Sequence, residues 1–251
     1  MNDEPKIEIL NDSQISLNDT FINFKLIIIG DSGVGKSSLL KRAVQNKFDP
    51  NYQATIGFEF LLMHFKVNDL KIKLQIWDTC GQEMYRSLVQ GFYRNTSLAI
   101  VVYDISSKKS FEGLDPWLKD LRQHTEPNIP VFIVGNKCDL ERVVETEEAK
   151  IFSVSNRTIY FTECSAKSGY NVKQIFFEAA KFLYKSYNTI KAQIQPQVAK
   201  KLKLDNKDAK DDKGKTIFFL EVEEEDGSWN EWRGSLWAPQ ACLPRPGGRP
   251  R

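Results

Sequence analysis

The spacing of apolar residues divides the chain into alternating strand-sized and helix-sized segments. Continuous apolar runs, typical of strands buried on both faces of a parallel sheet, occupy residues 25–30, 98–105, 131–137 and, more briefly, 158–164. Apolar residues at helical spacing mark residues 36–48, 110–124 and 170–187. Strands that alternate with helices predict βαβ units, and therefore an α/β fold whose mostly parallel sheet carries helices on both faces.

One pair of segments predicts a hairpin within this pattern. FEFLLMHFKVN and LKIKLQIWD flank the turn signal Asn68-Asp69. The hairpin adds one antiparallel edge strand to the sheet.

Both ends of the chain lack this periodicity. Residues 1–22 are polar, which predicts a flexible N-terminal arm, and residues 23–187 hold the periodic domain. Residues 188–215 are rich in Lys, Gln and Asp, and the last residues, CLPRPGGRPR, are rich in Pro, Gly and Arg. This composition predicts that residues 188–251 form a largely disordered tail.

Composition and charge exclude several classes of protein. A formal net charge of +2 indicates no nucleic-acid partner. The polar N-terminus is not a signal peptide, and the apolar runs are too short to span a bilayer. Four scattered cysteines, at positions 80, 138, 164 and 242, form no CxxC pair. Their spacing favours a reducing compartment over a disulfide framework or zinc site, so we expect a cytoplasmic protein.

The strongest local signal is GDSGVGKS, residues 30–37, which follows a predicted strand and begins a predicted helix. It fits the phosphate-binding pattern G-x-x-x-x-G-K-[ST] in the context that the motif requires. Backbone N–H groups of such a loop cradle phosphate oxygens, Lys36 neutralises the β- and γ-phosphates, and the Ser37 hydroxyl binds Mg²⁺. The predicted phosphate-binding residues are Asp31, Ser32, Gly33, Val34, Gly35, Lys36, Ser37 and Ser38.

Two further motifs indicate which base is bound. NKCD supplies Asn136, Lys137 and Asp139 directly after a buried strand, and SAK supplies Ser165, Ala166 and Lys167 after the next strand. The Asp139 carboxylate can accept both the N1 and the N2 hydrogens of guanine, a donor pair that adenine lacks. The Ala166 N–H can donate to guanine O6. An isolated NKxD motif is a common loop turn, but the three motifs in this order predict a guanine-nucleotide site.

At this point residues 24–187 resemble the Rab family of Ras-like small GTPases. The remaining family motifs stand in order as QATIGFEF, KLQIWDT, WDTCGQE, QEMYRSL and FYRN. The resemblance implies a P-loop small-GTPase fold with six strands, and a molecular switch that binds GTP and GDP and slowly hydrolyses GTP. It also implies, by analogy only, a role in vesicle trafficking.

The resemblance also implies roles for residues that the motifs above do not explain. Thr55 and Asp78 would join Ser37 at Mg²⁺, and Gly81 would donate its N–H to the γ-phosphate. Gln82 would orient the attacking water, which makes Gln82, Lys36 and Thr55 the predicted catalytic residues. Phe48 would lie against the guanine face, although a core phenylalanine at the end of the first helix explains it as well.

Partner contacts follow from the same resemblance. Effector proteins would contact an aromatic triad of Phe60, Trp77 and Phe92, together with the switch regions. Phe92 departs from the usual tyrosine, and ordinary half-buried packing is the alternative interpretation of all three rings. An exchange factor would reload the protein, and a GTPase-activating protein would supply the arginine that the chain lacks, because we find no internal arginine finger.

Two features depart from the family. Cys80 stands where alanine is usual, either as a tolerated small hydrophobe or as a group that slows hydrolysis or senses redox state. The last cysteine, Cys242, has nine residues after it, so no C-terminal prenylation motif is present. Three explanations stay open: a non-prenylated GTPase, a processed protein, or a terminal segment that is not the natural end of the reading frame.

Two other functions compete with the switch. One is a nucleotide-bound scaffold that recruits partners with negligible turnover, to which Cys80 and the unusual tail would point. The other is an ATP-dependent P-loop enzyme such as a kinase, which the NKCD and SAK motifs disfavour. Ser32 occupies the position of the superfamily where a bulky side chain is most damaging to hydrolysis. A serine at this position is common in Rab proteins, so we expect the chain to hydrolyse GTP.

Overall fold

The computed structural model describes residues 4–51, 58–79, 90–126, 128–201, 209–210, 216–223 and 229–234. The chain divides into two units, Met1–Ser186 and Tyr187–Arg251, each with its own sheet. The first unit holds the periodic domain that the apolar pattern predicts.

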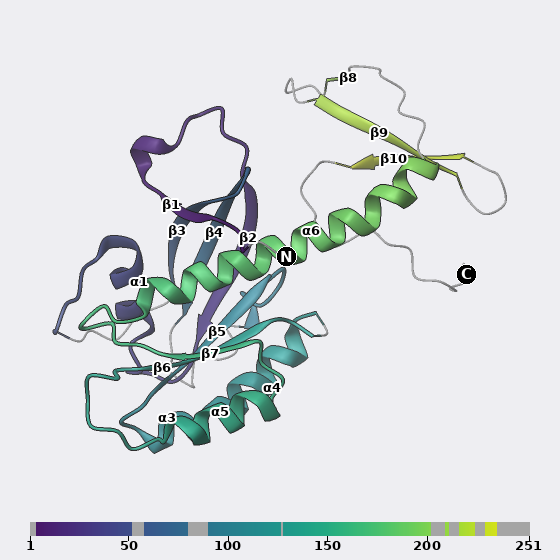
Figure 1. Ribbon diagram of the computed structural model, residues 1–251. Helices are drawn as coiled ribbons and strands as arrows, with labels where there is room; N and C mark the ends of the chain where they lie inside the picture. The colour runs from purple at the N-terminus through teal and green to yellow at the C-terminus, as the bar shows by residue number, and fades with distance from the viewer. Residues whose placement is uncertain are drawn as a thin grey trace. The chain divides into compact units, whose positions relative to one another are not determined.

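A seven-stranded sheet forms the centre of the first unit, in the order β1-β3-β4-β2-β5-β6-β7 (Figure 1). The strands are β1 (Ile7–Leu10), β2 (Ile22–Ile29), β3 (Phe58–Val67), β4 (Leu70–Thr79), β5 (Leu98–Asp104), β6 (Val131–Asn136) and β7 (Tyr160–Glu163). β4, β2, β5, β6 and β7 pair in parallel, whereas β3 is antiparallel to both of its neighbours. The α/β fold and the mostly parallel sheet are therefore confirmed.

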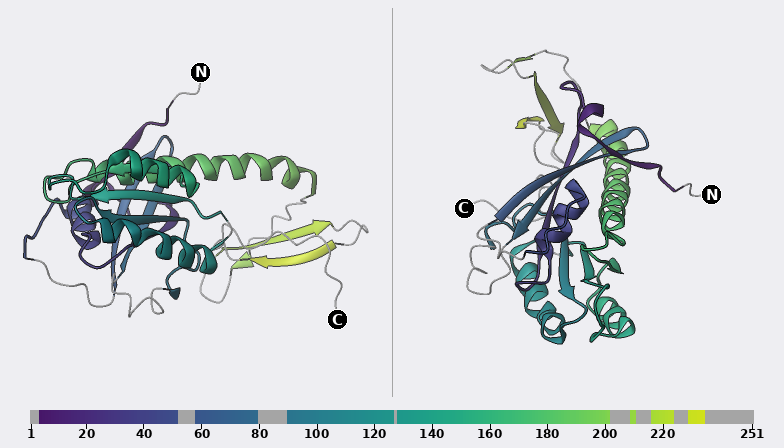
Figure 2. Two further views of the ribbon diagram at one scale, coloured as in Figure 1. Left: turned by 90° about the horizontal axis from the view of Figure 1, so that it is seen from below. Right: turned by 90° about the vertical axis from the view of Figure 1, so that its left-hand side faces the viewer.

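Helices cover both faces of this sheet (Figure 2). They are α1 (Lys36–Gln45), α3 (Lys108–Glu112), α4 (Leu114–His124), α5 (Thr146–Ser155) and α6 (Val172–Lys201). α3, α4 and α5 lie on one face, and α1 and α6 on the other, where Phe177 of α6 contacts the ring of Phe65 on β3. The expected helix over residues 110–124 is two helices, because the chain turns at Gly113.

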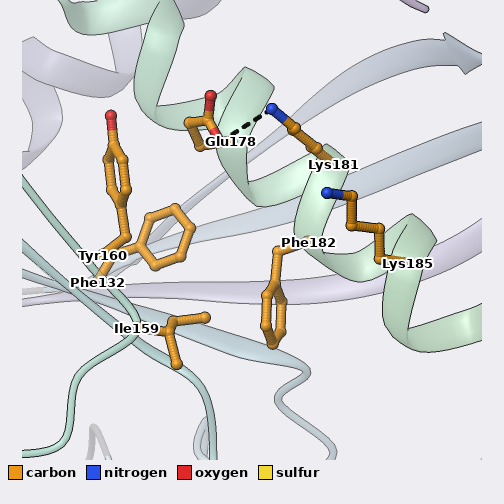
Figure 3. A pocket seen from close by; sticks show the side chains of 7 residues that line it. All are labelled: Phe132, Ile159, Tyr160, Glu178, Lys181, Phe182 and Lys185. Carbon is orange, nitrogen blue, oxygen red and sulfur yellow. Dashed lines mark ion pairs between the residues drawn. The ribbon is translucent and has the colours of Figure 1, made fainter. Parts of the chain in front are cut away.

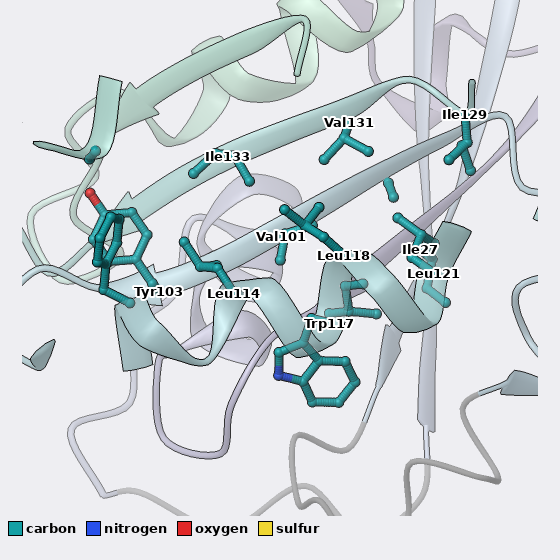
Figure 4. Packing of buried hydrophobic residues seen from close by; sticks show 14 of the residues in the cluster. Ile27, Val101, Tyr103, Leu114, Trp117, Leu118, Leu121, Ile129, Val131 and Ile133 are labelled. Carbon is teal, nitrogen blue, oxygen red and sulfur yellow. The ribbon is translucent and has the colours of Figure 1, made fainter. Parts of the chain in front are cut away.

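The core between the sheet and α4 is built from hydrophobic residues (Figure 4). Leu114, Trp117, Leu118 and Leu121 recur at spacings of three and four along α4, so they share one helix face. They pack on strand residues such as Val101, and all five side chains are buried. This packing fixes α4 against the strands whose carboxyl ends carry the nucleotide motifs.

The predicted count of six strands is wrong by one, because part of the expected N-terminal arm forms strand β1. Ile7 and Ile9 alternate with Glu8, and they stand opposite Val67 and Phe65 of β3. The Lys6 backbone also exchanges two 2.9 Å hydrogen bonds with Asn68 in the predicted hairpin turn. Four residues are too few for periodicity to reveal a strand, and the pairing partner lies about sixty residues away.

The second unit contains β8 (Ala209–Lys210), β9 (Thr216–Glu223) and β10 (Trp229–Gly234), in the antiparallel order β10-β9-β8. Sequence analysis expects this region to be largely disordered, and that expectation stays a prediction; it does not anticipate these three strands. The run TIFFLEVE in β9 is rich in β-branched and aromatic residues, which favour strands. The surrounding Lys, Asp, Pro and Gly content outweighed this local signal in the prediction.

Candidate functional site

The phosphate-binding loop leaves β2 and enters α1 at the carboxyl edge of the sheet. Gly30, Gly33 and Gly35 all have positive φ angles, of 138°, 81° and 93°. A Cβ atom on Gly30 would stand 2.2 Å from the Val102 carbonyl oxygen, so β5 leaves no room for a side chain there. Gly35 is the residue before α1, which places the first N–H groups of that helix at the end of the loop.

Lys36 lies inside this loop, where its side chain is buried. Its Nζ donates to the carbonyl oxygens of Gly30 and Asp31, both at 2.8 Å. The loop thus surrounds one ammonium group with its own backbone, an arrangement that supplies a fixed positive charge for anions.

A buried carboxylate lies beside the start of α1. The Ser37 hydroxyl donates to Asp78 Oδ2, and Asp78 at the end of β4 is fully buried. Among the described residues, Asp78 Oδ1 has no hydrogen-bond partner. Burial raises the pKa of Asp78 to about 6, against the opposing effects of the Ser37 hydrogen bond and the Lys36 ammonium. A hydroxyl and an incompletely satisfied carboxylate are oxygen ligands of the kind that Mg²⁺ prefers, so these residues fit that ion.

The NKCD and SAK loops meet at the ends of β6 and β7. Ser165 Oγ donates to Asp139 Oδ1 at 2.6 Å, and the Cys138 N–H donates to the Cys164 carbonyl at 3.0 Å. Lys167 Nζ approaches the other Asp139 oxygen at 3.8 Å. These bonds hold the Asp139 carboxylate between two loops.

Asn136 joins these loops to the phosphate-binding loop. Its Nδ2 donates to the Val34 carbonyl at 2.8 Å, while its Oδ1 accepts from the Ala166 N–H at 3.1 Å. A Cβ atom on Gly35 would lie 2.4 Å from Asn136 Nδ2, so the glycine permits this close approach. One side chain therefore fixes the distance between the phosphate end and the base end of the site.

Arg42 is a residue of this region that sequence reasoning missed. From α1 its guanidinium donates to the carbonyls of Ala166 at 2.8 Å and Lys167 at 2.7 Å. It also lies 6.0 Å from the ring centroid of Phe48, which is half-buried. Arg42 thus contacts both the SAK loop and the predicted base-contacting aromatic, whose role stays a prediction. No motif marks Arg42, because a lysine or arginine on a helix surface is ordinary.

Asp104 and the pair Arg142–Glu163 were also missed. Asp104, the last residue of β5, accepts from Lys137 Nζ at 2.6 Å and so holds the NKCD lysine. Arg142 makes a bidentate contact with Glu163 at 2.7 and 2.6 Å, which braces the loop after NKCD against β7. The position of Asp104 after an apolar strand was the available signal, since functional groups gather at carboxyl ends of parallel strands.

The predicted aromatic triad forms one cluster, which Phe58 completes. Ring centroids lie 5.0 Å apart for Phe60 and Trp77, 5.4 Å for Trp77 and Phe92, and 4.6 Å for Phe58 and Phe92. Phe58 and Phe60 are 54% and 40% exposed. Lys25 Nζ lies 5.3 Å from the Trp77 ring centroid. A set of contacting aromatic rings with two exposed members offers apolar surface to a partner.

Four predicted residues lie outside the described part of the chain: Thr55, Cys80, Gly81 and Gln82. Thr55 comes shortly before β3, which begins at Phe58, and the other three directly follow β4, which ends at Thr79. The Thr79 hydroxyl donates to the Ile28 carbonyl at 2.8 Å, which fixes the end of β4 beside the phosphate-binding loop. Cys242 also lies outside the described residues.

A small surface hollow of about 140 Å³ opens between β6, β7 and α6 (Figure 3). Phe132, Ile159 and Tyr160 line one side, and Glu178, Lys181, Phe182 and Lys185 of α6 line the other. Phe132 and Tyr160 stand at the amino ends of their strands, whereas the nucleotide motifs follow the carboxyl ends. The hollow is therefore separate from the candidate site.

Comparisons with known proteins agree with this geometry. A model of the Ras family matches residues 25–185. The Ras-related protein Rab11B of Nicotiana tabacum is 48% identical over 164 residues, which cover 64% of this chain and 75% of that protein. The Ras-related protein RABA1c of Arabidopsis thaliana is 48% identical over 157 residues, or 62% of this chain and 72% of that protein. The Ras-related protein RIC2 of Oryza sativa subsp. japonica is 44% identical over 164 residues, or 64% and 75% of the two chains.

Proposed function

Because this chain belongs to the Ras family of small GTPases and is similar to its Rab members, we propose that the loops described above form its nucleotide switch, residue by residue. As a Rab-type GTPase the protein binds GTP and GDP, hydrolyses GTP, and acts in vesicle trafficking. What we propose is which side chains perform these steps, with which metal and which partner surface.

The observation that carries the proposal is the double contact of Asn136. Its amide bonds to the phosphate-binding loop at Val34 and to the SAK loop at Ala166. Three segments, separated by 102 and 30 positions in sequence, therefore converge at one edge of the sheet. A nucleotide needs this arrangement, because its phosphates and its base must be held at a fixed separation.

At the base end, Asp139 would accept from N1 and N2 of guanine. The Ala166 N–H, which donates to Asn136 Oδ1, would share its hydrogen with O6. Adenine offers no matching pair of donors to the Asp139 carboxylate, which disfavours it strongly. Asn136, Lys137, Ser165 and Lys167 would hold these groups in place, as their contacts with Val34, Asp104 and Asp139 support. Phe48 would pack against the base from the side of Arg42.

At the phosphate end, Lys36 and the N–H groups of residues 31–38 would bind the phosphates. Ser37 and Thr55 would hold Mg²⁺ with Asp78, whose incompletely bonded, buried carboxylate supports that role. When bound, the ion supplies positive charge that stabilises the phosphate oxygens as the γ-phosphate leaves.

For hydrolysis, Gln82 would orient the attacking water and Gly81 would donate its N–H to the γ-phosphate. Such sites turn over at about 10⁻⁴ to 10⁻² s⁻¹ unaided and ~10³- to 10⁵-fold faster when an activating protein adds an arginine. Hydrolysis would therefore work as a timer. The segments around residues 50–57 and 79–94 would be ordered while the γ-phosphate is present and released after hydrolysis.

Effectors would bind the aromatic cluster of Phe58, Phe60, Trp77 and Phe92, and the partly exposed rings support this surface. We place the protein on the cytoplasmic side of endomembranes, as a peripheral protein. Among the described residues, no helix has the length and apolarity to cross a bilayer.

Single-turnover phosphate release from the purified, GTP-loaded full chain tests the enzymatic proposal. We expect a slow first-order release that requires Mg²⁺ and that Gln82→Ala slows by more than about tenfold, because the water loses its orienting group. Nucleotide binding without release, in wild type as in Gln82→Ala, would instead support the scaffold. Failure to bind either GTP or GDP would contradict both functions.

A further inference from the structure

An acidic residue lies inside the phosphate-binding loop, where its negative charge has the same sign as that of the phosphates. Asp31 directly follows Gly30, and its backbone carbonyl accepts from Lys36 Nζ at 2.8 Å. A carboxylate that turned toward the phosphates would repel them, since like charges at close range in a partly buried site interact strongly. Something must therefore hold the Asp31 side chain away from the ligand.

Trp117 on α4 performs this task. Its indole Nε1 donates to Asp31 Oδ1 at 2.8 Å, and the Trp117 side chain is fully buried. Trp117 belongs to the buried cluster around α4, and Figure 4 shows its ring on the other side of the α4 ribbon from Leu114 and Leu118. The indole cannot follow a moving carboxylate, because neighbouring side chains fix it in place.

Gly113 provides space for the same carboxylate at the start of α4. A Cβ atom at Gly113 would stand 2.5 Å from Asp31 Oδ2 and 3.0 Å from Asp31 Oδ1. The start of an α-helix also favours a negative charge. Since φ of Gly113 is −65°, in the right-handed helical region, backbone conformation does not require a glycine there. Close approach by Asp31 does.

We propose that Trp117 and Gly113 are positioning residues for nucleotide binding: together they hold the Asp31 carboxylate away from the phosphates and keep its carbonyl aligned on Lys36. The link runs from the indole to the Asp31 side chain, through the Asp31 backbone, to the ammonium group that binds phosphate. This inference rests on the proposed role of the loop, and it extends the site to a helix that no nucleotide motif marks.

Gly113→Ala gives the sharpest test, because it separates the loop from fold stability. Alanine is favoured over glycine in a helical conformation. This gain offsets part of the stability lost with the Asp31–Trp117 hydrogen bond, so the melting temperature should change little. The new methyl group should nevertheless push the carboxylate out of its place. We expect a fluorescent GDP analogue to dissociate about five- to tenfold faster from the variant, from loss of a hydrogen bond to a charged group.

Trp117→Phe tests the hydrogen bond itself, since phenylalanine keeps a ring but has no donor. We expect the same direction and a similar size of effect on GDP dissociation. Phe111→Leu is the matched control: Phe111 is a buried ring of α3 in the same cluster, and it should change dissociation by less than twofold despite a comparable loss of packing.

Double variants that also remove the Asp31 carboxylate distinguish a positioning role from a general loss of stability. Asp31→Ala, combined with Gly113→Ala or with Trp117→Phe, should slow GDP dissociation at least threefold relative to the corresponding single variant, because the displaced charge is gone. The inference is overturned if Gly113→Ala dissociates GDP within twofold of wild type, or if Asp31→Ala suppresses neither variant. If the wild-type chain itself does not bind the analogue, the proposed function fails instead.

Discussion

The two ends of the proposed nucleotide site, its base end and its metal end, differ in how they are held. At the base end, protein groups satisfy one another: Asn136 bonds to Val34 and Ala166, and Asp139 accepts from Ser165. At the metal end, Asp78 is buried beside Ser37, with one oxygen unpartnered among the described residues and with its pKa raised to about 6. At the base end these polar groups are hydrogen-bonded to one another, whereas at the metal end the charge of a buried carboxylate is only partly compensated.

This difference corresponds to the two tasks of a switch. Base recognition must be the same in the GTP and GDP states, so it benefits from groups that hydrogen bonds fix in advance. The phosphate end must respond to one phosphoryl group, so its stability has to depend on ligand charge. A buried carboxylate without full compensation provides such dependence, because added positive charge stabilises its ionised form.

The largest expected effect breaks the base end. In Asp139→Asn the carboxylate becomes an amide that cannot accept from both guanine donors, so GTP affinity should fall about a hundredfold or more. Xanthine carries an oxygen where guanine has its amino group, so xanthosine triphosphate should bind the variant better than GTP. Competition binding with both nucleotides measures the change.

The control for this variant is Asp69→Asn, in the exposed hairpin turn, which should bind GTP as wild type does. If Asp139→Asn kept its preference for GTP over xanthosine triphosphate, Asp139 would not be the base-reading residue.

The next effect concerns the metal end. Removal of Mg²⁺ with EDTA should speed GDP dissociation from the wild-type chain at least about tenfold, equivalent to ~1.4 kcal/mol. Asp78→Ala should already dissociate GDP faster and should respond much less to EDTA, because part of the metal site is lost. Stopped-flow release of a fluorescent GDP analogue resolves both rates. Equal EDTA responses in wild type and variant would place the ion elsewhere.

The same contrast explains what sequence could predict. The base end and the phosphate-binding loop follow from short motifs at the ends of apolar strands, so local pattern was sufficient to locate Lys36 and Asp139. The contacts that support them join distant residues: Arg42 reaches Ala166 across 124 positions, and Trp117 reaches Asp31 across 86. Such pairs leave no periodic signal, since each member alone is an ordinary helix residue.

Edge and tail strands escaped prediction for a related reason. β1 has four residues, and its partner β3 follows much later in the chain. β9 and β10 lie in a region whose composition indicates disorder, so a local strand signal was outweighed there. Continuous apolar runs such as Leu98–Asp104 were found readily, because a strand buried on both faces is recognisable by itself.

The smallest expected effect lies at Cys80, beside the residues proposed to sense the γ-phosphate. Cysteine exceeds alanine by one sulfur atom and is a small, weakly polar group. Cys80→Ala should therefore change single-turnover GTP hydrolysis by less than about tenfold, ~1.4 kcal/mol. It should leave the affinity for GDP unchanged, because the contacts with the base are not affected.

Hydrolysis by both proteins with and without a thiol reductant separates a packing role from a redox role. A reductant effect that disappears in Cys80→Ala would assign the thiol to redox sensing. A more than tenfold faster rate in Cys80→Ala would show that the sulfur restrains loop closure. GTP hydrolysis at the metal end would then be slowed by Cys80 as well as dependent on the metal ion.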